Sequence, residues 1–182
     1  MPTPNTQTQA LWQYNRALLT QAMETVQRLQ AQARPGFDYA RAVGPHLRHI
    51  IEHYQALLRA LRPAARRCVD YDERERDLEV QSRSEATLQA LRQLMAEMAT
   101  QAQNPDWRLD LPLETRLRSG PAGEFEVVVP TTLGRELLFL SSHTVHHFAL
   151  LGHYCKAAGV DLDPDFGKAP ATVAFERTVV CA

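Results

Sequence analysis

Four long segments without breaks constrain the fold of this chain more than any other feature of its sequence. Each segment repeats apolar residues at the three- and four-residue spacing of an amphipathic helix. The segments are residues 6–33, 44–61, 82–101 and 132–158 of a chain of 182 residues. The first ends at Pro35-Gly36 and the last at Gly159, which are common helix stop signals. Four long helices in one chain predict an all-α fold, a four-helix bundle of the up-down type.

Residues 107–130 leave the helical pattern and predict a small β-hairpin. Leucines recur at every second position over 109–113, a glycine-rich turn follows at 120–123, and apolar residues return at 125–129. A lone hairpin is only marginally stable in water, so we expect it to pack on the bundle, inserted between the third and fourth helices.

Two other segments show no helical periodicity. Residues 66–80 are rich in charge, which predicts a connecting loop with short turns. Residues 160–182 contain two prolines and a glycine and predict an extension packed on the bundle. Neither an internal repeat nor a shift in composition marks a boundary, so we expect one domain over residues 1–182.

Charge and composition exclude several classes of protein. The formal net charge is −1 and no basic patch is present, so neither nucleic acid nor an anionic membrane surface is an expected partner. No apolar run approaches the roughly 20 residues that span a bilayer. The first 15 residues lack the basic and apolar regions of a secretory signal. Cys68, Cys155 and Cys181 are odd in number and widely spaced, which predicts reduced thiols in the cytoplasm.

The histidines are the candidates for chemistry. All seven lie in two short segments, 46–53 and 143–153, within the second and fourth predicted helices. His143 and His147 are four residues apart, so they lie about 40° apart on the same, apolar face of their helix. A divalent metal ion would satisfy the ring nitrogens of two buried imidazoles, and so would hydrogen bonds to backbone or carboxylate groups. The spacing alone leaves both readings open.

The second helix offers three histidines for the same site. His46, His49 and His53 lie within about 60° of one another on the helix surface. His46 and His53 flank the apolar stripe of this helix, whereas His49 lies further round it. Periodicity therefore slightly favours His46 or His53 as a ligand and does not choose between them.

Two motifs give the chain a resemblance to a known family. They are Val43-Gly44-Pro45-His46-Leu47-Arg48-His49-Ile50 on the second helix and His143-x-x-x-His147 on the fourth. Together with the helix order over residues 10–160, they resemble the DinB/YfiT-like family of metal-dependent enzymes. The resemblance implies a metal site formed by His49, His143 and His147. The Arg-Gly-Gln that usually follows the His-His pair in the family is Phe148-Ala149-Leu150 here, so the chain resembles a divergent branch.

The resemblance also implies an activity and its partners. Relatives in that family are hydrolases or low-molecular-weight-thiol S-transferases, so we expect a small-molecule substrate, with a thiol cosubstrate in the second case. Zinc or nickel is the expected ion, and manganese or iron would also suit an all-nitrogen site. Three protein ligands leave coordination positions open, which is typical of catalytic sites. The alternative is a non-catalytic, stress-related metal-binding or scaffold protein, and a homodimer is compatible with both.

Other residues are expected around the ligands rather than on the ion. His46, His53 and Tyr154 are candidate supporting or pocket residues. Glu136 lies on the ligand face, but seven residues before His143, or about 10.5 Å along the helix axis, which is too far for shared ligation. We expect Glu136 either to support the site or to pair with an arginine.

The charged segment at 66–80 is a further source of polar groups. Tyr71, Arg74 and Arg76 could reach over the site and bind an anion there. Surface charge on a loop is the commoner explanation for such residues, so the anion-binding role is the minor alternative.

Overall fold

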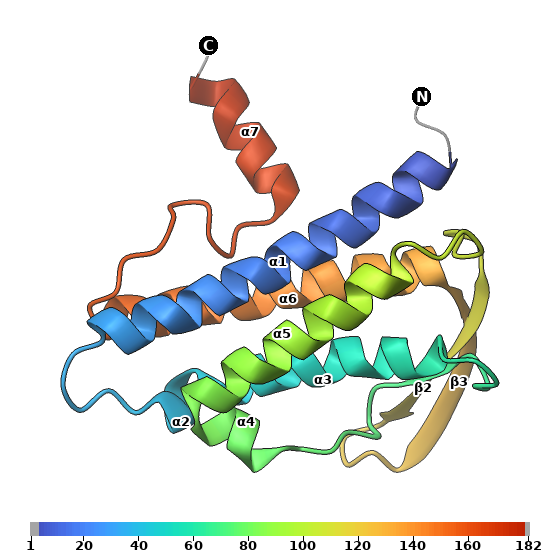
Figure 1. Ribbon diagram of the computed structural model, residues 1–182, viewed down its shortest axis with the longest axis horizontal. Coiled ribbons are helices and arrows are strands. Elements are labelled where there is room, and N and C mark those ends of the chain that lie inside the picture. The colour runs from blue at the N-terminus through green and yellow to red at the C-terminus, as the bar shows by residue number, and fades with distance from the viewer. Residues whose placement is uncertain (1–3, 181–182) are drawn as a thin grey trace.

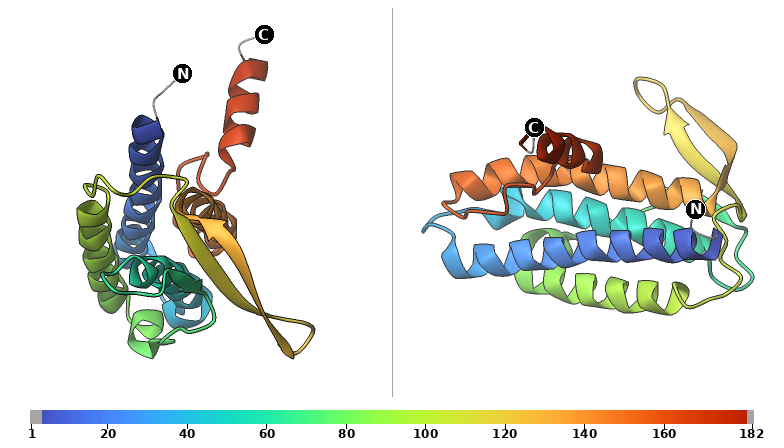
Figure 2. Two further views of the ribbon diagram at one scale, coloured as in Figure 1. Left: turned by 90° about the vertical axis from the view of Figure 1, so that its right-hand side faces the viewer. Right: turned by 90° about the horizontal axis from the view of Figure 1, so that it is seen from above.

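The computed structural model describes residues 4–180, and within this range the chain forms seven helices and three strands. Four long helices lie side by side as a bundle, as Figures 1 and 2 show. They are α1 (Pro4–Gln32), α3 (Gly44–Ala60), α5 (Ser84–Gln101) and α6 (Leu133–Ala157). Two short helices, α2 (Tyr39–Ala42) and α4 (Leu78–Ser82), precede α3 and α5. The long helices therefore match the four segments predicted from periodicity.

Apolar side chains at helical spacing form the core between the long helices. The largest of the fully buried ones are Trp12 and Leu19 of α1, Leu47, Ile50, Ile51, Tyr54, Leu57 and Leu58 of α3, Leu91 and Met98 of α5, and Leu133 and Phe148 of α6. Burying one such side chain stabilises the fold by about 1.5–3 kcal/mol relative to leaving it exposed. The shared core holds α3 beside α6, and these two helices carry the histidines.

A buried polar network fixes how α1, α3 and α6 meet. The Tyr54 hydroxyl donates to Asn15 Oδ1 over 2.7 Å, and the Thr144 hydroxyl donates to the Tyr54 oxygen over 3.3 Å. The Asn15 amide donates in turn to the carbonyl oxygen of Leu137 over 3.2 Å. Because buried polar groups are costly to leave unpaired, these bonds set the register of the three helices. Thr144 is the neighbour of His143, so the same register positions the site.

A three-stranded mixed sheet at one end of the bundle corrects the all-α class to a mainly helical fold (Figures 1 and 2). The strands β2 (Pro112–Ser119) and β3 (Phe125–Thr132) form the predicted hairpin between α5 and α6. The strand β1 (Cys68–Asp70) pairs with β2 in parallel, which gives the order β1-β2-β3.

The segment at 66–80 is more ordered than the loop predicted for it, since it contains β1 and the start of α4. The Asp77 carboxylate caps α4 by accepting from the backbone nitrogens of Glu79 and Val80 over 2.8 and 3.2 Å. Strand β1 is too short to show an alternating pattern. Val69 pairs with Thr115, 46 residues further along the chain, so the strand depends on a partner that no local pattern reveals.

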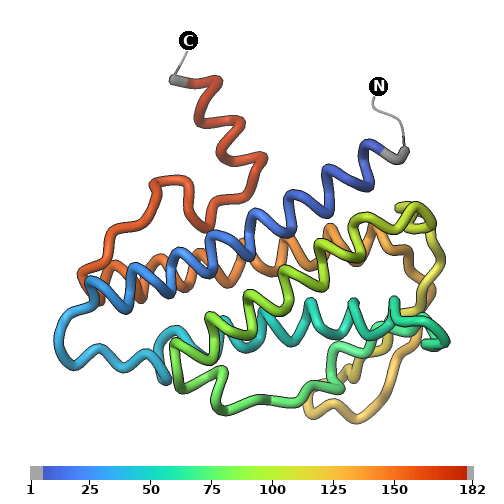
Figure 3. The backbone as a smooth tube through the Cα atoms, in the orientation of Figure 1, coloured from blue at the N-terminus to red at the C-terminus, as the bar shows by residue number. Residues whose placement is uncertain are grey.

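The C-terminal extension runs back over the bundle from the end of α6, as the backbone trace in Figure 3 shows. Phe166 stacks on Phe148 of α6 with ring centroids 4.6 Å apart. Gly167 has a φ of +75°, and a Cβ atom there would lie 2.5 Å from the backbone nitrogen of Ala149. Glycine is therefore the residue that permits this close approach.

The last helix, α7 (Pro170–Val180), rises away from the bundle (Figure 2). It exposes the rings and methyl groups of Phe175 and Val179 to solvent. Two surface ion pairs hold its base, Lys168 to Glu176 at 2.6 Å and Arg177 to Asp165 at 3.2 Å. None of the helices within residues 4–180 is both long and apolar enough to cross a membrane.

Candidate metal centre

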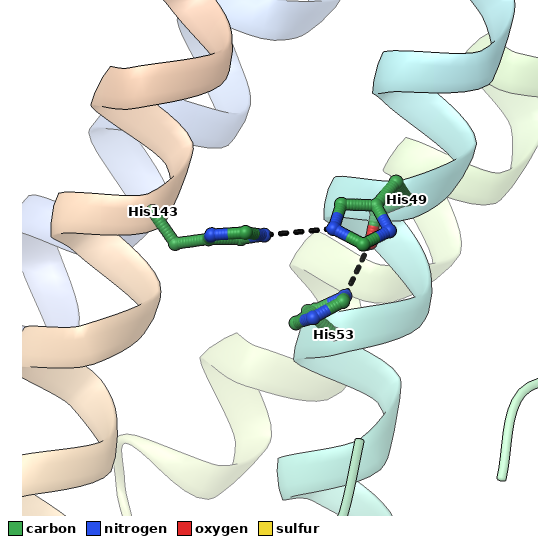
Figure 4. Close-up of side chains that lie close together, drawn as sticks. All are labelled: His49, His53 and His143. Atoms are coloured by element: carbon green, nitrogen blue, oxygen red, sulfur yellow. Dashed lines mark hydrogen bonds between the residues drawn. The ribbon is translucent and has the colours of Figure 1, made fainter. Parts of the chain in front are cut away.

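Two pairs of histidines face each other across the contact between α3 and α6. His49 and His53 are four residues apart on α3, and His143 and His147 are four apart on α6, so each pair projects from one face of its helix. Figure 4 shows His143 reaching across from α6 to His49, with His53 on the next turn of α3. Ligand nitrogens of His49, His53 and His143 all lie within 4.8 Å of one another. These three side chains form the candidate metal centre.

Hydrogen bonds fix the rings of this centre. His143 Nε2 lies 2.9 Å from His49 Nε2. His53 Nδ1 lies 2.8 Å from the backbone carbonyl oxygen of His49. A carbonyl oxygen only accepts, so His53 carries its proton on Nδ1 and keeps a lone pair on Nε2. Metal-binding histidines commonly make this second bond, which orients the ring.

His147 belongs to the same cluster, although its nitrogens bond differently. Its ring centroid lies 4.6 Å from that of His143 and 4.8 Å from that of His49. Its Nδ1 atom, however, is 3.0 Å from Nδ1 of His46, which pairs the two imidazoles with each other. The ring of Tyr154 lies 5.6 Å from His46, at the edge of the cluster. The three histidines implied by the family resemblance are thus together, and His53 stands among them.

The imidazoles of the cluster are held in the neutral form. Burial, followed by the charges of neighbouring histidines, lowers the pKa of His49 to about 2 and that of His147 to about 3. Burial lowers the pKa of His53 to about 4, against the effect of its bond to the His49 carbonyl oxygen. The pKa values of His46 and His143 are lowered too, again mainly by burial. Neutral imidazole is the form that binds a metal, so the rings do not need to lose a proton near neutral pH.

Glu136 supports the centre from behind and does not reach it. The carboxylate is fully buried and accepts hydrogen bonds from the hydroxyls of Tyr71 and Thr131 over 2.5 and 2.6 Å, and from Arg135 over 2.9 Å. The Tyr71 ring stacks on His53, with centroids 5.1 Å apart and planes 18° apart. Glu136 thus pairs with an arginine, and it also bonds a tyrosine whose ring packs on His53.

The segment that follows β1 brings two polar residues to the histidines. Tyr71 is buried there, which raises its pKa. Arg74 places Nη1 2.5 Å from Nδ1 of His49, and its side chain is 17% exposed. Arg76 is exposed on the same loop. Arg76 is therefore an ordinary surface charge on a loop, whereas Arg74 contacts a histidine of the site.

Two further contacts were not anticipated from the sequence. Phe139 stacks on His143 with ring centroids 5.4 Å apart, and its position four residues earlier on α6 was a usable signal. Glu52 is buried on α3 and lies 3.4 Å from Arg48 and 3.8 Å from Arg74. A glutamate beside apolar residues on α3 gave no indication of its partner, because Arg74 comes from a separate segment.

The donor set fits a divalent transition-metal ion. Three neutral imidazole nitrogens are borderline-soft ligands, which suit zinc, nickel or iron better than calcium or magnesium. Three protein ligands also leave room for other ligands on such an ion. His146 and His153 are exposed on α6 and lie outside the donor set.

Comparison with known proteins does not assign a family. No family model matches the sequence, and no solved structure matches it. The chain is similar to FK506-binding protein 5 of Rhizopus delemar, with 27% identity over 105 residues. That alignment covers 58% of this chain and 26% of the relative, so the chain spans about a quarter of the relative's length. The functional argument therefore depends on the site itself.

Proposed function

We propose that this protein is a metal-dependent enzyme of the DinB/YfiT-like type that holds one divalent ion between α3 and α6. The observation that carries the proposal is the convergence of the His49, His53 and His143 nitrogens within 4.8 Å of one another. Neutral imidazoles that are already gathered at this distance favour metal binding, because little reorganisation is needed to bring them onto one ion.

His49 and His143 are the two ligands on which geometry and resemblance agree. For the third ligand, geometry favours His53, because its ligand nitrogen lies within 4.8 Å of those of His49 and His143. The family resemblance favours His147, whose Nδ1 is paired with His46. We propose His53 as the third ligand and place His147 and His46 beside the ion.

The reaction class that this site suits is hydrolysis or thiol S-transfer on a small-molecule substrate. A bound zinc or nickel ion would supply Lewis acidity to the substrate or to a thiol cosubstrate. The chain itself orients the ligands, because Tyr71 and Phe139 stack on His53 and His143 and fix both rings. We place this reaction in the cytoplasm, because the free thiols of Cys68 and Cys155 suit a reducing compartment, whereas Cys181 lies outside the described residues.

A second candidate function is a non-catalytic, stress-related binding or scaffold protein. The observation in its favour is that several ring nitrogens already pair within the protein, His143 with His49 and His46 with His147. In this case the histidines would serve packing, and the cluster would need no ion. A homodimer is compatible with both functions and is measured by size exclusion with light scattering.

Elemental analysis of tag-free protein tests the metal proposal. We expect about one equivalent of zinc or nickel per chain, and loss of this metal in His49→Ala and His143→Ala. His153→Ala is the matched control, since this histidine is exposed on α6. Substoichiometric metal that added zinc or nickel does not restore would contradict the metal site and favour the scaffold.

A further inference from the structure

Arg74 lies beside the candidate metal centre, and one of its buried N–H donors has no hydrogen-bond partner. Its Nη1 atom lies 2.5 Å from His49 Nδ1, and its Nε atom is buried and has no hydrogen-bond partner. The guanidinium group has five N–H donors and no acceptor. One donor of this largely buried side chain therefore contacts a histidine of the site, and a second, the Nε–H group, has no acceptor.

The contact with His49 fixes the proton positions in the histidine pair. Since Arg74 can only donate, Nδ1 of His49 is an acceptor, and the ring proton of neutral His49 is on Nε2. Nε2 then donates to His143 Nε2, 2.9 Å away. A neutral histidine that ligates through Nε2 carries its proton on Nδ1 instead. Once His49 acts as a ligand, Arg74 loses its acceptor and needs another one.

One buried carboxylate lies between Arg74 and a second arginine, whereas Asp70, Glu73 and Glu75 line a pocket together with Arg74. Glu52 is the carboxylate that pairs with Arg74, at 3.8 Å, and Arg48 shares it at 3.4 Å. Asp72, whose charge acts on His53, is exposed and accepts from the backbone nitrogen of Arg118. Two guanidinium groups thus share one buried carboxylate next to neutral histidines. The buried Nε–H donor of Arg74 still has no hydrogen-bond partner, which favours a ligand that brings an acceptor to this position.

We propose that Arg74 binds the carboxylate group of the substrate beside the metal centre. This inference rests on the proposed function and names its substrate class, a small carboxylic acid. A single guanidinium fork matches one planar carboxylate with two parallel hydrogen bonds. A phosphate dianion carries two negative charges, which match one guanidinium less well than a monoanionic carboxylate does while Arg48 remains paired with Glu52. Arg74 is in this sense a substrate-positioning residue.

Acetate titration of the cobalt-loaded protein tests the inference without an assay of activity. Co²⁺ in the histidine site reports on added ligands through its visible absorption bands. We expect acetate to shift these bands in the wild type and to bind about tenfold or more weakly to Arg74→Gln, because a charge-assisted hydrogen-bond pair is lost. Arg76→Gln is the matched control on the same loop and should behave as the wild type does.

A second readout locates the bound acetate. In the zinc-loaded protein, the Nε–H resonance of Arg74, assigned by its absence from the Arg74→Gln spectrum, should shift on addition of acetate. Arg74→Lys keeps the charge but not the planar fork, so it should bind acetate more weakly than the wild type. This variant decides the question if Arg74→Gln does not fold, which circular dichroism would show.

The outcomes separate this inference from the proposed function. If the wild type takes up no cobalt, the metal proposal fails. If it takes up one equivalent but Arg74→Gln or Arg74→Lys binds acetate as tightly as the wild type, the carboxylate site alone is wrong. Tighter binding of inorganic phosphate than of acetate would also overturn the carboxylate assignment.

Discussion

The histidines of α3 and α6 differ in how closely their nitrogens gather, and only His49, His53 and His143 form a set of three whose ligand nitrogens lie within 4.8 Å of one another. We expect His53→Ala to weaken zinc binding about as much as His49→Ala, by about tenfold or more, and His147→Ala to have a smaller effect. The reason is that the ligand nitrogens of His49, His53 and His143 lie within 4.8 Å of one another, a group that does not include His147. Competition with a chromophoric chelator measures the affinities.

His146→Ala is a control for this series, because this residue is exposed beside the cluster. If His147→Ala weakens zinc binding strongly and His53→Ala only slightly, the third ligand is His147, as the family resemblance implies. Equal losses in both variants would indicate that four histidines share the ion.

The sequence allowed part of the site to be predicted. The four-residue spacing of His143 and His147 showed a shared helix face, and periodicity slightly favoured His46 or His53 on α3 without choosing between them. The position of Arg74 beside the histidines could not be predicted in the same way. Its segment has no helical or strand periodicity, so the direction of its side chain depends on the path of the backbone. That path depends on the pairing of β1 with β2, which is a non-local interaction.

At the scale of whole elements, the long helices were predictable because their signals are local. Apolar spacing and stop signals occur within each segment, so each helix can be read by itself. The corrected elements are those held by other parts of the chain. Strand β1 forms only by pairing with β2. Helix α4 has five residues, so the Asp77 cap is the main signal for it in the sequence.

Helix α7 is expected to be dispensable for the fold and for metal binding. Its side chains are mainly exposed, and its ion pairs are surface pairs worth about 0–1 kcal/mol each. Removal of residues 170–182 should therefore change the free energy of unfolding by no more than about 2 kcal/mol. Urea unfolding and zinc affinity of the truncated chain measure both effects.

A longer truncation, from residue 160, provides the contrast. It also removes the buried Val160 and the Phe166 ring that covers Phe148 of α6, so it should cost at least about 1.5–3 kcal/mol more than the shorter truncation. A large loss of zinc affinity after the shorter truncation would show instead that α7 contributes to the site.

At the scale of the whole molecule, the buried histidines should make the metal-free protein sensitive to acid. Unfolded histidines have a pKa of about 6.5, whereas burial lowers the pKa of His49 to about 2 and that of His53 to about 4. Below about pH 6.5 the unfolded chain binds more protons than the folded chain, which favours unfolding. Stability should be complete above about pH 6.5 and decrease as the pH falls towards about 4.

Urea unfolding of the metal-free protein at several pH values tests this direction. The double variant His49→Gln and His53→Gln should show a flatter profile, because both groups no longer titrate. A wild-type stability that stays constant or rises between about pH 7 and about pH 5 would contradict the lowered pKa values.

The bundle brings His49 to His143, although 94 residues separate them along the chain. Closing such a long loop in a flexible chain carries an entropy cost that an ion would have to overcome by itself. Here the apolar core and the Tyr54 network stabilise the folded chain and so offset this entropy cost before the ion binds. A peptide that joined the two histidine segments through a flexible linker should therefore bind metal more weakly than the folded chain, even with identical ligands. Helix packing thus replaces the close sequence spacing by which short metal-binding motifs preorganise their ligands.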